Sequence, residues 1–122
     1  MYKNIQNLEL LMEKNIEEFI AHFNQGDFFK AHEVLEELWQ KTIGVNRDAI
    51  QGLIQLAVAL HHAQHKNEKG AFYEHNLAKK KLENYPPLLF GINLQKLLSD
   101  AEIFFQQYPF QLQSPPTIQT IK

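Results

Sequence analysis

Apolar residues recur at three- and four-residue spacing along most of the chain, which is the pattern of helices with one buried face. The strongest pattern spans residues 48–65, where apolar side chains cover most of the helical circumference and a few polar ones share a narrow stripe. A helix that is apolar almost all round must be covered by other helices. We therefore predict a buried central helix over residues 48–65.

Four further segments have the same periodicity and predict helices around the central one. They span residues 4–24, 28–42, 71–84 and 93–107. The apolar face of the first contains Ile5, Leu8, Met12, Ile16, Phe19 and Phe23.

Turn-forming residues separate these helices. Asp27 stands where a helix N-cap belongs, directly after Gly26. Gly44 is the expected left-handed residue of the next turn, and Pro86-Pro87 ends the fourth helix because proline donates no helical hydrogen bond. A loop over residues 66–70 completes the set.

These elements predict an all-α fold, a compact bundle of about five helices with repeat-like helix-turn-helix pairing. Residues 26–31 and 66–71 open helices forty residues apart with similar sequences, as stacked helical hairpins would. We expect one domain over residues 1–108 and an extended or disordered tail over 109–122. Ile118 and Ile121 of this tail could dock in a groove on this or another chain.

The composition excludes several classes of function. With 122 residues and a net charge of −2, the chain has neither a basic surface for nucleic acid nor a polybasic surface for a membrane. It contains no cysteine, so thiolate chemistry is excluded. The first twenty residues contain several glutamates and do not read as a signal peptide, so we expect a cytoplasmic protein. An apolar face left open on the fourth or fifth helix would favour a homo-oligomer.

The candidate chemistry lies in the second helix, Ala31-His32-Glu33-Val34-Leu35-Glu36-Glu37-Leu38-Trp39. His32 and Glu36 share one side, four residues apart, among apolar residues, whereas Glu33 points outward or to the rim. A lone carboxylate in apolar surroundings costs several kcal/mol, so Glu36 needs a partner, and His32 is the nearest. The sequence predicts that both side chains face the interior.

The central helix offers further members of this site. Gln55, His61 and His62 could join the cluster, and the ring of Trp39 could form its wall.

Three interpretations of this cluster stay open. It could be a buried polar network that fixes helix register and binds nothing. It could be a pocket for a small ligand or for catalysis without a metal, with Trp39, Gln55 and His62 as binding residues. It could also hold a divalent metal such as zinc, iron or manganese through His32, Glu36 and His61. In that case Glu33 or a bound water would act as the base of a hydrolase.

Three features of the sequence resemble those of a known family. They are the Ala-His-Glu-x-x-Glu-x-x-Trp motif at 31–39, the Gln-Gly-Leu-Ile-Gln segment at 51–55 and His61. Over about residues 23–82 the chain resembles the bacterial and archaeal "domain of unknown function 309". The resemblance implies an all-α fold and points to His32, Glu33, Glu36, Trp39, Gln55 and His61. It implies no established activity.

Overall fold

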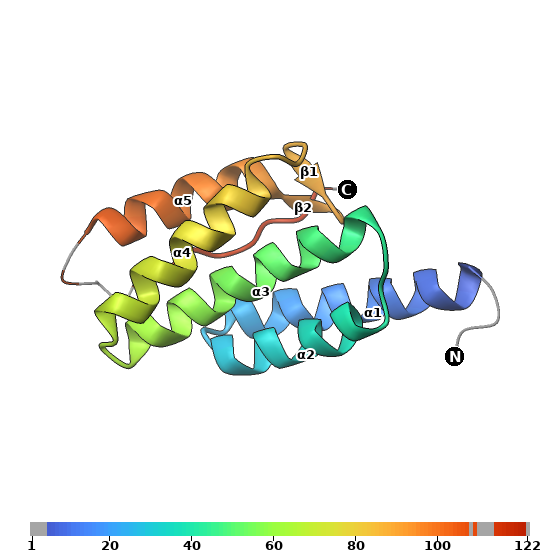
Figure 1. Ribbon diagram of the computed structural model, residues 1–122, viewed down its shortest axis with the longest axis horizontal. Helices are drawn as coiled ribbons and strands as arrows, with labels where there is room; N and C mark the ends of the chain where they lie inside the picture. Colours follow the sequence, from blue (N-terminus) through green and yellow to red (C-terminus); the bar gives the residue numbers. More distant parts are fainter. Residues whose placement is uncertain (1–4, 108, 110–113, 122) are drawn as a thin grey trace.

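The computed structural model describes residues 5–107, 109 and 114–121, with side chains from residue 9 onward. The side chains of Ile5 and Leu8 and residues 110–113 of the tail therefore lie outside the described part. The elements follow in the order α1 Ile5–Asn24, α2 Phe28–Gln40, α3 Val45–Gln64, α4 Glu68–Leu82, β1 Leu88–Leu89, β2 Ile92–Asn93 and α5 Leu94–Gln106 (Figure 1). The predicted all-α fold is confirmed.

Helix α3 is the centre of the bundle. It lies between α2 and α4, with α1 and α5 behind it (Figure 1). Four of its large aliphatic side chains have no exposed surface, and these are Ile50, Leu53, Leu56 and Leu60. The helix begins three residues before the predicted start, because Gly44 (φ 84°) takes the positive φ that turns the chain into Val45.

The two turns that join paired helices are built alike. Asp27 Oδ1 accepts a hydrogen bond from the Lys30 N–H at 3.2 Å, so the predicted N-cap is confirmed. Asn67 Oδ1 accepts from the Gly70 N–H at 3.1 Å in the same way. Because Asn67 caps α4, this helix begins at residue 68 rather than at the predicted 71.

A short hairpin and an ordered tail segment complete the fold. β1 and β2 pair antiparallel, and neither strand was predicted from the sequence. Within the described part of the tail, residues 114–121 contain no helix, and Ile118 is buried against the chain's own core. Of the alternatives for Ile118, docking on its own chain is the one observed. Ile121 is 48% exposed.

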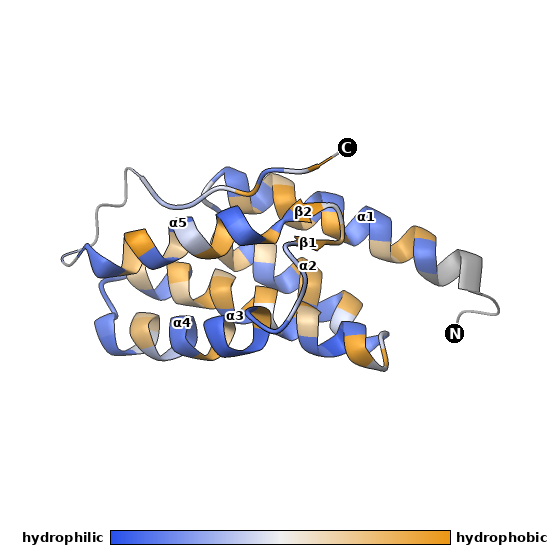
Figure 2. Cartoon of the chain, turned by 90° about the horizontal axis from the view of Figure 1, so that it is seen from above, coloured by the Kyte–Doolittle hydropathy of each residue, from blue (hydrophilic) through white to orange (hydrophobic). Residues whose placement is uncertain are grey.

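Each helix contains both hydrophobic and hydrophilic residues, and the apolar faces of the helices pack together in the core (Figure 2). Among the described residues, no helix combines the length and the apolar character needed to cross a membrane.

Candidate functional site

His32 is held in one tautomer by its own helix. Its Nδ1 bonds the backbone carbonyl oxygen of Phe29, one turn earlier. A carbonyl oxygen only accepts, so Nδ1 carries the proton and Nε2 keeps a lone pair when the ring is neutral. The side chain is 16% exposed, which places this Nε2 at the surface edge of α2.

Glu36 is not in the interior, which corrects the expectation from the sequence. Its side chain is 54% exposed, and its Oε2 lies 3.7 Å from His32 Nε2 on the same helix. The helical wheel placed Glu36 between Phe29 and Ile43 and took both for core residues. They are 48% and 89% exposed, so the stripe that flanks Glu36 is itself part of the surface.

His61 on α3 lies close to Phe29 on α2. Its ring centroid is 5.4 Å from that of Phe29 and 4.3 Å from that of His65, one turn further along α3. Burial lowers the pKa of His61, and the neighbouring His65, His62 and His32 lower it further, against a smaller opposing effect of Asp27. The His61 imidazole therefore stays neutral more readily than that of an isolated histidine.

His62 faces α4 rather than α2. Its Nδ1 lies 3.2 Å from Asn67 Nδ2, which donates to it, and the ring stands against Gly70, where a Cβ would come within 2.9 Å of it. Burial raises the pKa of Glu74 on α4, and His62 lowers it. His62 therefore contacts the start of α4.

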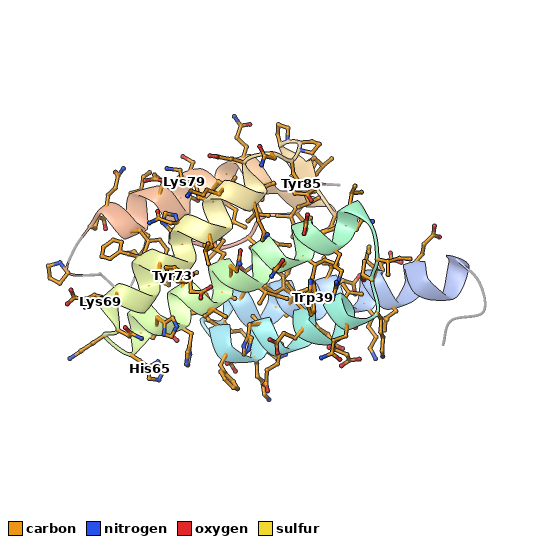
Figure 3. The ribbon with its side chains drawn as sticks, viewed as in Figure 1. Trp39, His65, Lys69, Tyr73, Lys79 and Tyr85 are labelled. Atoms are coloured by element: carbon orange, nitrogen blue, oxygen red, sulfur yellow. The ribbon has the colours of Figure 1, made fainter. Side chains whose placement is uncertain are left out.

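Trp39 and Gln55 each contain a buried polar atom without a hydrogen-bond partner among the described residues, Nε1 and Oε1 respectively. The guanidinium of Arg47 lies 3.7 Å from the centre of the Trp39 ring and covers it. Arg47 Nε also donates to the Trp39 carbonyl oxygen at 3.4 Å. Figure 3 shows Trp39 and His65 towards opposite ends of the α2–α3 pair.

Glu33 is exposed, as the wheel predicted. Among the described residues, no group of three or more histidine, aspartate or glutamate side chains could hold a metal ion, and His32, Glu36 and His61 form no such group. The metal-dependent hydrolase stays a prediction from the sequence.

Phe29 and His65 are members of this face that the sequence analysis did not assign to the site, and Arg47, for which the sequence offered Glu36 or Glu37 as partners, lies on Trp39. The four-residue spacing of His61 and His65 was the available signal, because residues one turn apart meet on a helix. The stacking of Arg47 on Trp39 had no local signal, because it joins two helices.

The fold and these side chains define a small domain of paired helices with an imidazole-bearing face over α2 and α3. Residues 16–73 match the model of a family described as "Domain of unknown function (DUF309)". This segment contains all of α2 and α3, so the resemblance carried by the His32 and Gln55 motifs is confirmed over it.

Two relatives are similar over part of their length. An uncharacterized protein of Aquifex aeolicus (strain VF5) is 35% identical over 82 residues, which are 66% of this chain and 24% of the relative. The uncharacterized protein YpuF of Bacillus subtilis (strain 168) is 46% identical over 46 residues, 37% of this chain and 26% of the relative. The matched segments thus span about a quarter of each relative's length.

Proposed function

We propose that this chain is a binding module and that the face made by α2 and α3 recognises a polypeptide segment. The observation that carries the proposal is the pair of buried, unpartnered atoms, Trp39 Nε1 and Gln55 Oε1. A buried polar group without a partner costs about 1–3 kcal/mol, and a binding partner that satisfies it recovers that free energy. Trp39 Nε1 is a donor and Gln55 Oε1 an acceptor, and a peptide group offers one acceptor and one donor.

Movement of Arg47 would give a ligand access to this face. It is exposed, lies over the Trp39 ring, and can swing away without disturbing the core. On the α3 wheel, Gln55 lies about 80° from Arg47, so both residues are on the same side of the helix. A peptide that displaces Arg47 would reach Trp39, and Gln55 lies about 12 Å further along the same side of α3.

The exposed members of the face support binding over a structural network. Among the described residues, Glu36 forms an ion pair only with His32 of its own helix, at 3.7 Å. An ion pair within one helix does not join that helix to another. Phe29, next to His32, offers 48% of its surface to a partner. Exposed aromatic side chains beside polar groups are typical of interface centres.

Tryptophan fluorescence tests the proposal, because Trp39 is the chain's one tryptophan. A random peptide library is selected on the wild-type protein, and selected peptides are titrated while the emission is followed. We expect saturable binding with a shifted emission, lost in Gln55→Leu and retained in the matched variant Gln51→Leu one turn earlier. Gln55→Leu is expected to be as stable as wild type or more stable, because it removes an unsatisfied buried oxygen.

Two results would contradict the proposal. One is a library that yields no peptide dependent on Gln55. The other is a marked loss of stability in Gln55→Leu, which would make the side chain a structural element.

A further inference from the structure

A second surface lies away from the imidazoles, between α1 and the C-terminal end of the described chain. It is a groove of about 650 Å³. One wall is the α1 face that carries Met12, Ile16 and Ile20, and the other includes Phe90 of the β1–β2 turn and Ile121 of the tail. Figure 1 shows the N-terminal part of α1 extending past the end of α2. The floor of the groove is apolar and open to solvent.

One rim of this groove is a row of carboxylates. Glu9, Glu13 and Glu17 line it, each one helical turn after the previous one. All three are exposed, and among the described residues none of them forms an ion pair. Four residues of helix rise by about 6 Å, so the row presents negative charges at about 6 Å intervals along α1. The opposite wall contributes no charged side chain among its described residues.

The groove is held open by the fold itself. The Ile118 N–H donates to Asn24 Oδ1 at 2.7 Å, and Asn24 Nδ2 donates to the Ile118 carbonyl oxygen at 3.0 Å. The Ile121 N–H donates to the Gly91 carbonyl oxygen at 2.9 Å. These bonds fix the tail wall before anything binds, which lowers the ordering cost of association.

We propose that this groove docks a basic amphipathic helix of another protein. An apolar floor requires an apolar stripe on the occupant, and a row of carboxylates one turn apart is matched by Lys or Arg at the same spacing on a helix lying alongside α1. A second copy of this chain does not fit through the same surface, because its own α1 would bring Glu13 and Glu17 against their equivalents. The proposal is independent of the peptide-binding face on α2 and α3.

The test is a binding titration with a designed probe. A fluorescein-labelled 18-residue helical peptide has leucines on one face and lysines on the other, and a control peptide has glutamates in place of the lysines. We expect the lysine peptide alone to raise the fluorescence anisotropy saturably, with affinity that falls as salt is added. Glu17→Lys is expected to weaken binding by about tenfold. Glu18→Lys, the neighbouring residue with the same change in charge on another side of α1, is expected to change it less than about twofold.

The apolar floor is tested separately with Met12→Asp, which is expected to abolish saturable binding while circular dichroism shows an intact fold. Equal weakening by Glu17→Lys and Glu18→Lys would overturn the proposal, because it would reduce the effect to net charge. Binding of the glutamate peptide would also overturn it. A light-scattering mass of a dimer that Met12→Asp converts to a monomer would assign the groove to a second copy instead.

Discussion

The two helical hairpins, α1–α2 and α3–α4, have the same turn. Helices α1 and α3 begin and end forty residues apart, at Ile5–Asn24 and Val45–Gln64. The Asp27 N–H donates to the His22 carbonyl oxygen at 3.0 Å, and the Asn67 N–H donates to that of His62 at 2.9 Å. The capping bonds described above repeat at the same offset. The hairpins are therefore one local design used twice.

Their interiors differ. The first hairpin contains Phe19 and Phe23, with ring centroids 5.5 Å apart, where the second has Ala59 and Ala63 at the equivalent positions. In the second, Gly52 lies so close to α4 that a Cβ would come within 2.7 Å of Leu82 Cγ. Turn chemistry is local and tolerates different cores, whereas the size of the side chains decides how closely two helices approach.

The two hairpins also differ in the role of a polar side chain at equivalent positions. Asn15 on α1 donates through Nδ2 to the Val34 carbonyl oxygen at 3.2 Å and so joins the two helices of its hairpin. Its equivalent forty residues later is Gln55, whose Oε1 has no partner among the described residues. One hairpin uses its polar side chain for structure, and in the other the equivalent side chain is the one through which we propose binding.

The largest effect is expected in the aromatic hairpin. Phe23 is 1% exposed and packs against the Phe28 ring at 5.0 Å between centroids. Phe23→Ala copies the second hairpin's residue into the first but leaves a cavity, because α1 and α2 cannot close onto it. We expect a loss of about 3–5 kcal/mol in the free energy of unfolding, measured by urea denaturation. A loss below about 1 kcal/mol would show that the two interiors are interchangeable.

The reverse change, adding volume to the close-packed hairpin, is expected to cost less. Gly52→Ala places a methyl group against Leu82 and Lys81. We expect a loss of about 1–3 kcal/mol from overpacking, which outweighs the better helix propensity of alanine. The thermal midpoint measures it. A raised midpoint would mean that α3 and α4 separate easily and that their contact is not close-packed.

A pH titration separates the hairpins further, because buried His75 of α4 has Leu35 as its equivalent. Burial lowers the pKa of His75 and Lys79 lowers it further, against an opposing effect of Glu102. Above the ordinary value of 6.5 the imidazole is neutral in both states. As the pH falls below it, the unfolded chain takes the proton more readily, so stability is lost.

His75→Leu is expected to flatten this loss between pH 7 and pH 5, measured by urea denaturation across that range. Part of the slope should remain, because the pKa of His61 is lowered too. An unchanged slope in His75→Leu would contradict the assignment.

The smallest conformational effect is expected at the turns. Lys66 has φ 57° where the first turn has Gly26 at φ 80°. A lysine in this region is strained, so Lys66→Gly is expected to stabilise the protein by about 0.5–1 kcal/mol, and Gly26→Ala to destabilise it by about 1 kcal/mol. Equal and opposite shifts of the thermal midpoint would confirm that the turns are equivalent. A destabilising Lys66→Gly would show that the lysine side chain makes up for its backbone strain.

The sequence predicted the five helices because each has a clear apolar period, and a capping residue such as Asp27 marks where the second one begins. It missed β1 and β2, which are two residues long and turn through Phe90 and Gly91, without the Asn-Gly or Asp-Gly signal of a hairpin. It grouped His32 with His61, and the structure places both on the α2–α3 face. It misplaced Glu36, because a helical wheel finds apolar neighbours but does not tell whether they are covered.

The most direct test of the account is the stability of Glu36→Ala. The account holds that the side chains of the α2–α3 face are presented for binding and do not hold the bundle together. Glu36 is exposed and, within the part of the chain that the structure describes, forms an ion pair only within its own helix. Its removal should therefore change the free energy of unfolding by less than about 0.5 kcal/mol in urea denaturation. A loss of more than about 2 kcal/mol would contradict the account and restore the structural network.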